Sequence, residues 1–555
     1  MILHLIGLLG LAYLVWSLVS MELNYRRAST MGIPLVRLPV DGQNVLWASI
    51  EGHLWPLLDR LSIDWGTFGI YSRRGWSFKD NGDSHRRYGP IWALVTPVGI
   101  YVQVADPGAI NEVFQRRTDF IRPVEMYKVL EVYGPCISTA TWAEWPRHRK
   151  VLATPFNEKI MSFVWDESVE QTRQLLEAWA DDQILSVAKD TRNLSLNVLA
   201  ATGFRKSYRF HSANHPHDKE TNESSGYRDA LQTVLDNCIL LMVAPRRFLT
   251  LSFAPPSWKN LAKAADKFKQ YMVDMLDEET KALKHGKTGS GSIMTSFVRA
   301  MDQAEAVSGE NATSGSMSKG LTVDEILGNI FAINFAGHDT TANTLSFAIY
   351  LLAAHPEVQD WVSEELQSVA VAPGNYKDIF PRLSRCKAVL LETLRLFPPI
   401  PSLPKWTSDQ PQLLKVGERT ITILPDIGIY PSLLAMQVDP QYWEDSFVWQ
   451  PSRWIQTSSN MSTVGNEQLV TPLPNTYFPW SDGPQNCPGA KFSQVEFVAV
   501  MGMLLKNHRI HPIAAPGETQ EQLRNKIWDA VRDVDMVLLL RMKDSHRVQL
   551  RCDRV

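Results

Sequence analysis

The sequence predicts one large, mainly α-helical domain with a few small β-sheets, preceded by one N-terminal transmembrane helix. Three observations predict this: long helical stretches, only short strand-like runs, and an almost wholly apolar start. No internal repeat or linker divides the rest of the chain. We therefore expect a membrane anchor over residues 1–21, a neck and N-terminal segment over 22–65, and a single globular domain over 66–555.

The main elements follow from periodicity and from helix and turn signals. Helices are predicted at 165–180, 260–284, 323–354 and 356–371. Strands are predicted at 91–95, 100–104, 420–424 and 536–541, and loops at the polar stretches 211–226, 286–320 and 457–475. Thr322 and Glu325 form a capping box at the start of the third helix.

Charge and cysteine content exclude several function classes. The chain has 56 basic and 59 acidic residues and a formal net charge of -3, which gives no electrostatic footprint for nucleic acid. The five cysteines include no CxxC pair, so neither a zinc site nor a disulfide framework is indicated. We expect no nucleic-acid partner.

The apolar start favours an anchor over a cleaved signal peptide. Ile2–Val19 would span roughly 27 Å as a helix, close to the thickness of the hydrocarbon core. A signal peptide needs a basic start and small residues at the cleavage site, and neither is present. Because Arg26 and Arg27 follow the run, the body should face the cytosol. We expect a single-pass protein of the endoplasmic reticulum membrane, with the bilayer as a partner.

One cysteine lies in a sequence that favours a metal-bound thiolate. Cys487 is bracketed by Gly483 and Gly489, which permit a tight loop and the close approach of a flat ligand. An apolar helix is expected at 490–506, so the cysteine lies just before a helix N-terminus, where a thiolate is favoured. A thiolate on haem iron promotes O–O cleavage. The alternative is a structural cysteine in a turn.

The long helix at 323–354 carries polar residues within an apolar stretch. Such groups are costly unless they are paired or functional. Small Ala336 and Gly337 would let a flat cofactor and oxygen lie against the backbone. Asp339 and Thr340 can relay protons to oxygen, which is a general acid role. The alternative is a kinked helix with a solvated polar patch.

The cysteine loop resembles the haem-binding loop of the cytochrome P-450 superfamily. Its pattern, Phe-x-x-Gly-x-Arg-x-Cys-x-Gly, is matched at Gly483, Cys487 and Gly489, whereas Trp480 replaces the Phe and Gln485 replaces the Arg. The resemblance implies the cytochrome P-450 fold, haem b as cofactor and Cys487 as the axial thiolate. It also implies that the other four residues contact the haem.

Two further motifs occur in the family's order. Residues 336–341 resemble its oxygen-binding motif, Ala-Gly-x-Asp-Thr-Thr. Glu392 and Arg395 share a helix face, and with Arg453 they resemble a buried triad that holds the thiolate loop against the core. The resemblance gives this triad a structural role.

Other residues resemble those that bind the haem propionates. Trp145 and Arg149 match the family's Trp-x-x-x-Arg motif, and arginine suits carboxylate geometry. Lys405 stands near the place where family members often have an arginine. Because Gln485 lacks the charge of the usual arginine, we expect the propionates to depend more on Arg149.

The resemblance implies a monooxygenase that hydroxylates or epoxidises a lipophilic small molecule. No Rossmann fingerprint or flavin domain occurs in the sequence, so an NADPH-dependent flavoprotein reductase is expected to supply electrons. The sequence of residues 478–489 resembles that of fungal members of the family, which suggests secondary metabolism, such as terpenoid or polyketide biosynthesis. Candidate pocket segments are 123–132, 330–335 and 400–403, and the apolar stretch 239–256 is expected to dip into the bilayer surface or to be buried core.

Two alternative functions remain open. A haem-thiolate isomerase or lyase would keep the fold, but Asp339 and Thr340 argue against it because such members often lack this pair. The other alternative is a non-catalytic membrane haem protein. NADPH consumption with a reductase and candidate lipids would separate all three functions.

Overall fold

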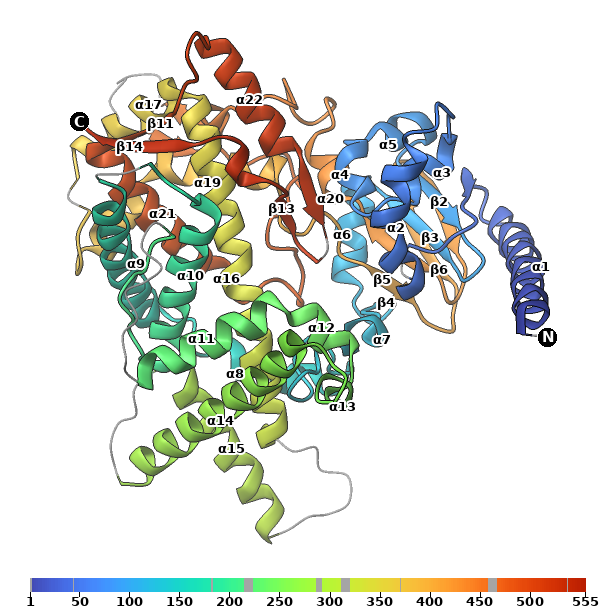
Figure 1. Ribbon diagram of the computed structural model, residues 1–555, viewed down its shortest axis with the longest axis horizontal. Coiled ribbons are helices and arrows are strands. Elements are labelled where there is room, and N and C mark those ends of the chain that lie inside the picture. Colours follow the sequence, from blue (N-terminus) through green and yellow to red (C-terminus); the bar gives the residue numbers. More distant parts are fainter. Residues whose placement is uncertain are drawn as a thin grey trace.

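The computed structural model describes residues 2–42, 44–180, 183–213, 223–285, 292–310, 320–369, 371–457, 467–536 and 538–555. Most helices gather on one side of the molecule and the largest β-sheet lies on the other (Figure 1). The long helix α16 (Val323–Ala354) runs through the helical part and carries the candidate oxygen motif.

The elements have the following bounds. The other helices are α1 (Ile2–Ser29), α2 (Val45–Leu58), α3 (Gly66–Tyr71), α4 (Trp76–Asp80), α5 (Asp83–Tyr88), α6 (Pro107–Gln115), α7 (Val124–Tyr127), α8 (Trp145–Ala153), α9 (Glu158–Trp179), α10 (Val187–Phe204), α11 (Glu223–Asp236), α12 (Cys238–Val243), α13 (Arg246–Leu249), α14 (Pro256–Lys284), α15 (Ile293–Glu310), α17 (Pro356–Gln367), α18 (Tyr376–Ile379), α19 (Ser384–Leu396), α20 (Leu433–Gln437), α21 (Ala490–Asn507) and α22 (Gln520–Arg532). The strands are β1 (Leu35–Arg37), β2 (Ile91–Val95), β3 (Ile100–Val104), β4 (Phe120–Ile121), β5 (Lys405–Thr407), β6 (Gln412–Val416), β7 (Arg419–Ile423), β8 (Gly428–Pro431), β9 (Ile455–Thr457), β10 (Glu467–Leu469), β11 (His508–Pro512), β12 (Val534–Met536), β13 (Leu540–Met542) and β14 (Leu550–Arg554).

The largest sheet has six strands in the order β1-β2-β3-β8-β5-β4. Strands β2 and β3 form an antiparallel hairpin in which Ile91 lies opposite Val104, and β3 pairs with β8 in parallel. The remaining described strands form two-stranded pairs. The expectation of a mainly helical fold with small sheets is confirmed.

Helix α16 is the centre of the packing. Its side chains from Leu345 to Ala354 belong to the largest buried core together with residues of α9, α19 and α21. Thr322 and Glu325 form the predicted capping box, with the Thr322 hydroxyl accepting from the Glu325 N–H at 3.3 Å. The helix therefore begins and ends where its sequence predicted.

Several sequence predictions were wrong. The expected loop at 457–475 contains β10, and the expected loop at 211–226 includes the first residues of α11. The expected loop at 286–320 contains α15, because Ile293, Met294 and Phe297 turn one apolar face into the core although Gly and Ser surround the segment. Within that loop, 286–291 and 311–319 lie outside the described residues. The expected continuous strand at 536–541 is divided between two antiparallel strands, because Met536 ends β12 whereas Leu540 and Arg541 belong to β13.

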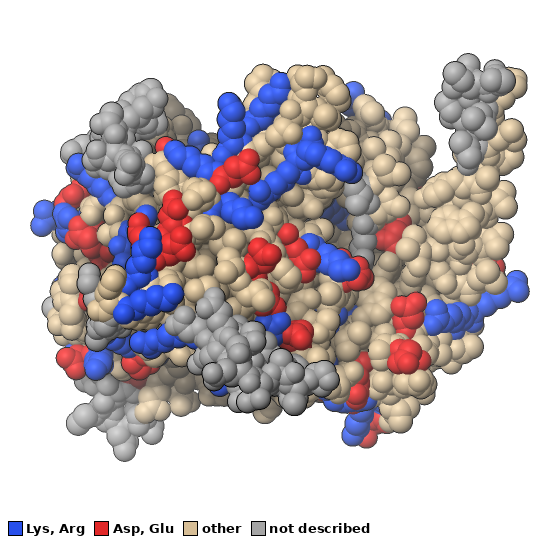
Figure 2. Space-filling view, turned by 90° about the horizontal axis from the view of Figure 1, so that it is seen from below, with Lys and Arg blue, Asp and Glu red and all other residues tan. Residues whose placement is uncertain are grey.

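Helix α1 extends beyond the predicted anchor and is attached to the body by its last turns. The Asn24 amide donates to the carbonyl oxygen of Thr96 at 2.9 Å, and Ala28 is buried beside Met31 and Ile33. The first turns project from the body as an arm without basic or acidic side chains (Figure 2). Among the described residues, the structure contains no helix with both the length and the apolarity of a membrane span. The span expected over Ile2–Val19 is thus not supported by the structure.

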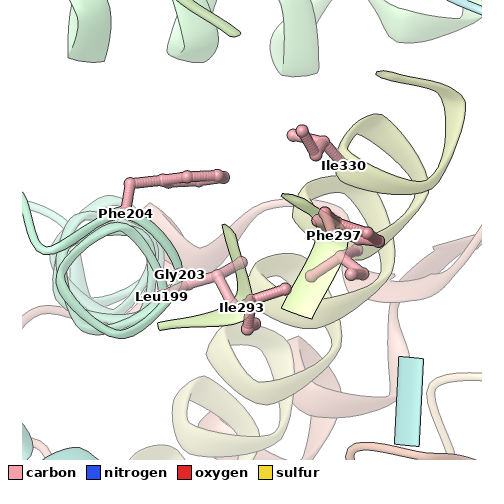
Figure 3. Close-up of a pocket in the computed structure, with 7 residues that line it drawn as sticks. Leu199, Gly203, Phe204, Ile293, Phe297 and Ile330 are labelled. Atoms are coloured by element: carbon pink, nitrogen blue, oxygen red, sulfur yellow. The ribbon is translucent and has the colours of Figure 1, made fainter. Parts of the chain in front are cut away.

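A small apolar cavity lies behind α16. It is a narrow gap without room for a water molecule, and it is lined by Leu199, Gly203, Phe204, Ile293, Phe297, Ile330 and Ile333. Figure 3 shows Ile330 pointing towards the same space as Phe297 and Phe204. Ile330 is 1% exposed. The segment 330–335 is therefore in part packing against α10 and α15, not only the lining of a substrate pocket.

Candidate active site

Cys487 lies in a loop whose shape depends on glycine. The backbone N–H of Cys487 donates to the Trp480 carbonyl at 2.9 Å, which closes the loop. Gly483 has a φ of +67°, and a Cβ there would lie 2.5 Å from the carbonyl oxygen of Phe114. Only glycine fits this position. The Trp480 indole donates to the Ser493 hydroxyl at 3.0 Å and so ties the loop to α21.

The thiol of Cys487 is solvent-accessible although protein atoms surround it on most sides. This desolvation raises its pKa, whereas the Gly489 N–H and the positive charge of Arg149 lower it. The expectation that the helix N-terminus favours the thiolate is therefore only partly right, because desolvation outweighs it. A metal cation would complete the loss of the proton, since a coordinating thiol binds as thiolate.

Helix α16 has an open face at the oxygen motif. Ala336 is exposed and Thr340 is partly exposed, within a helix that is otherwise mostly buried. The Thr340 hydroxyl donates to the Ala336 carbonyl at 2.8 Å. A Cβ on Gly337 would instead lie 3.2 Å from Leu199, so its small size serves the packing of α16 on α10. Ala336 and Thr340 are the residues that can meet a flat ligand.

Asp339 is not free at this face. Its Oδ1 accepts from Nε of Arg192 at 2.6 Å, and Nε2 of His338 lies 3.3 Å away. Arg192 of α10 also reaches Asp236 at the end of α11, at 3.4 Å. Asp339 must leave Arg192 before it can pass a proton towards Thr340. No local sequence pattern points to Arg192, which is 147 residues away from Asp339.

Three cations lie beside the cysteine loop. Arg149 donates to the carbonyl of Asn486 at 2.8 Å, and Lys405 donates to the side-chain oxygen of Gln485 at 2.5 Å. Arg122 donates to the Ile137 carbonyl at 2.9 Å. In the described part of the chain none of the three forms an ion pair with a carboxylate.

The electrostatics of this cluster favour an anionic ligand. Burial lowers the pKa of Arg122 and of Arg149. Burial, followed by the charge of Arg122, lowers the pKa of Lys405 to about 7. A buried cation such as Lys405 and partly buried cations such as Arg122 and Arg149 are stabilised by a counter-charge, so the cluster suits a ligand with two carboxylates. The haem propionates fit this chemistry, and the cysteine beside them fits the iron.

The cluster includes both predicted and unpredicted residues. Trp145, one helical turn before Arg149 on α8, is 5% exposed and stacks on Trp142 at 5.9 Å. Arg122 was missed, because it stands in a sequence with no partner or motif nearby. Only the fold places it close enough to Lys405 for its charge to lower the pKa of that lysine.

The predicted triad is present, with Glu392 and Arg395 fully buried and Arg453 partly buried. Glu392 and Arg395 are both 0% exposed, and Glu392 accepts from Arg395 at 2.9 Å and from Arg453 at 3.0 Å. The Trp454 indole and the Gln450 N–H add further donors, each at 2.9 Å. The carboxylate is thus satisfied on both oxygens, and it joins α19 to the segment that follows α20.

The contacts in this cluster predict which residue contributes more to haem retention. We expect Arg149→Ala to lose haem faster than Gln485→Ala, because a charged hydrogen bond contributes about 1.5–3 kcal/mol against about 1 kcal/mol for a neutral one. Arg149 also holds Asn486, next to Cys487. Transfer of haem to an apo-globin acceptor measures the rates. Faster loss from Gln485→Ala would remove Arg149 from its assigned role.

Comparison with known proteins agrees with this geometry. The family model described as cytochrome P450 matches residues 70–528 of this chain. A cytochrome P-450 monooxygenase of Arthrobotrys oligospora is 28% identical over 96% of this chain and 95% of its own length. A phomenoic acid biosynthesis cluster cytochrome P-450 monooxygenase of Leptosphaeria maculans is 27% identical over 94% of this chain and 95% of its own length.

A solved structure extends the agreement to the fold. A crystal structure of a cytochrome P-450 superposes with a TM-score of 0.63, at 19% identity, over 89% of this chain and 99% of the other. The profile match spans both the cysteine loop and α16. On this evidence the chain belongs to the cytochrome P-450 family.

Proposed function

We propose that this haem monooxygenase inserts one oxygen atom from O2 into a lipophilic small molecule, by hydroxylation or epoxidation, in secondary metabolism such as terpenoid or polyketide biosynthesis. The observation that carries the proposal is the exposed Cys487 thiol near buried Lys405 and partly buried Arg122 and Arg149, which form no ion pair with a carboxylate in the described part of the chain. Fungal relatives of similar length, one named for a biosynthesis cluster, support the metabolic setting. An NADPH-dependent flavoprotein reductase would supply the electrons.

The chain's own residues have separate tasks in this reaction. When bound, haem supplies the oxidising chemistry, with Cys487 on its iron. Arg122, Arg149 and Lys405 would hold the propionates, aided by Gln485. Thr340 holds a proton at its hydroxyl on the open face of α16, and Asp339 can replace that proton once it leaves Arg192.

The proton-delivery role predicts a specific defect. Thr340→Ala should retain haem but divert electrons from NADPH into peroxide, because no donor remains on the open face of α16. General acid groups typically contribute about 10²–10⁴-fold to rate, so product per NADPH should fall severely. Product, NADPH and peroxide are measured together in a reductase-coupled assay.

Thr341→Ala is the matched control. Its hydroxyl donates to the Gly337 carbonyl and it is 4% exposed, so it lies off the open face. Equal coupling in the wild type and Thr340→Ala would remove Thr340 from proton delivery. An isomerase or lyase would instead turn over without NADPH. Comparison of metabolites between a deletion strain and its parent identifies the substrate class.

We propose further that the protein associates with the endoplasmic reticulum membrane and faces the cytosol. The exposed apolar side chains of α1, including Leu11, Leu14 and Leu18, support this proposal. The basic pair at the end of α1, Arg26 and Arg27, favours the cytosolic side. Phe253, just after α13, is 83% exposed and offers a further apolar side chain.

Truncation tests the membrane proposal. Removing residues 1–21 should release much of the protein from sedimented membranes, because the exposed apolar turns of α1 are lost. The haem spectrum should not change, since Asn24 and Ala28, which attach α1 to the body, remain. If the truncated protein still sediments completely, the segment 239–256 is the main attachment.

A further inference from the structure

A second cavity lies between α3, α4 and α5, apart from the active-site residues described above. Its volume of about 370 Å³ lies within the roughly 300–1,000 Å³ of small-molecule sites. Tyr71 and Trp76 line it, with their rings edge to face at 4.9 Å, and Ile70 stands at its rim with 40% exposure. The cavity thus offers apolar and aromatic surface to an occupant.

The charges that line this cavity are unbalanced. The carboxylate of Asp83 is bound by Arg86, which does not line the cavity. Asp80 accepts the N–H and the hydroxyl of Ser84, at 3.1 and 2.6 Å, and burial raises its pKa. Asp83 is therefore paired with Arg86, and the raised pKa of Asp80 makes its negative charge easier to neutralise.

Two cations remain available. Arg73 is occupied by Asp59, with Nη1 2.9 Å from Oδ2. Lys79 and Arg87 also line the cavity, and neither makes an ion pair in the described part of the chain. Both side chains are exposed, so they are free to turn towards an anion at the mouth of the cavity, to which their charges are attracted.

The cavity is connected to α1 through α2. Asn24 of α1 donates to the Thr96 carbonyl at 2.9 Å, and the Thr96 hydroxyl donates to Asp41 at 3.0 Å, just before α2 begins. At the other end of α2, Asp59 binds Arg73 at the cavity. The 14 residues of α2 span roughly 21 Å. Figure 1 shows α2 to α5 at the same end of the molecule as α1.

Helix α2 exposes an apolar stripe along this connection. Leu46, Ile50 and Leu57 share one helix face and are 77%, 53% and 58% exposed. Leu61, just beyond the helix, is 50% exposed. An exposed apolar stripe that ends beside a cationic cavity matches a molecule with an acidic head and apolar chains.

We propose that this cavity binds the headgroup of an anionic phospholipid, with its phosphate at Lys79 and Arg87 and its acyl chains along α2. The inference relies on the proposed membrane association only for the source of the lipid. Binding here would fix how the β-sheet side of the protein meets a bilayer.

Short-chain lipids test the site without inserting α1 into a membrane. Titration calorimetry of the full-length haem protein in non-ionic detergent compares dihexanoyl phosphatidylglycerol with dihexanoyl phosphatidylcholine. We expect phosphatidylglycerol to bind at least about ten-fold more tightly, since a pair of charged contacts is involved, and added salt to weaken it. Equal affinities for the two lipids would overturn the proposal. So would hexanoate or inorganic phosphate alone binding as tightly as phosphatidylglycerol.

The double variant Lys79→Ala/Arg87→Ala should lose this preference, with haem content showing that it is folded. Lys159→Ala/Lys377→Ala removes two exposed charges from other helices and should retain it. A variant lacking both cavity cations that still prefers phosphatidylglycerol would contradict the assignment. Failure of the truncation test with a positive lipid titration would overturn the anchor but not this site, and the reverse result would overturn this site alone.

Discussion

Cys487→Ser should abolish the thiolate-type absorption of the reduced carbonyl complex and all product formation. A serine hydroxyl keeps its proton at neutral pH and is a poor ligand for iron, whereas a thiolate is the ligand that favours O–O cleavage. The loop should survive, because its hydrogen bond from the Cys487 N–H to Trp480 uses only the backbone. The measurement is the difference spectrum of the reduced protein with carbon monoxide, together with haem content.

A second cysteine variant controls for general damage. Cys552 is 5% exposed in β14, away from the cysteine loop. Cys552→Ala should therefore keep the thiolate spectrum. If Cys487→Ser kept that spectrum, the axial ligand would have to be sought among the other cysteines.

Glu392→Ala should cause the largest loss of stability of any single change considered. Removing one partner of a buried ion pair costs about 3–5 kcal/mol, because the other charge stays buried without compensation. Here the carboxylate serves Arg395 and Arg453 at once, and Arg395 is 0% exposed. A typical domain has only about 5–15 kcal/mol of stability, so much of this variant should fail to hold haem. The urea midpoint from circular dichroism, with haem content, measures the loss.

Two further variants keep this prediction testable. Glu392→Gln retains acceptor and shape but removes the charge, so it should fold and lie between wild type and alanine. Glu170→Ala breaks a half-exposed pair with Arg173 and should change stability by about 1 kcal/mol or less. If Glu392→Ala and Glu170→Ala had the same midpoint, the buried triad would not stabilise the loop that it joins to α19.

Local sequence patterns predicted what local geometry determines. The capping box at Thr322 and the long uninterrupted run that follows were enough to place α16. Glu392 and Arg395 were recognisable because their i, i+3 spacing is itself the contact. Gly483 was recognisable because a positive φ beside another backbone demands glycine.

Long-range contacts were not predictable in this way. Arg122 and Arg192 look like ordinary surface arginines in the sequence, and only the fold brings them to Lys405 and Asp339. Helix α15 was missed because Gly and Ser around it suggest a loop, whereas its apolar face is stabilised by tertiary packing. The burial that raises the pKa of Cys487 was not predictable for the same reason, since desolvation depends on neighbours from distant segments.

The attachment of α1 has a mechanical consequence. The helix is continuous from Ile2 to Ser29, and its last turns are fixed to the β2–β3 hairpin through Asn24 and to the core through Ala28. An α-helix of this length is a stiff rod of roughly 42 Å. Without a hinge, any torque on its free end turns the six-stranded sheet by the same angle. The tilt of α1 and the orientation of the catalytic domain therefore change together.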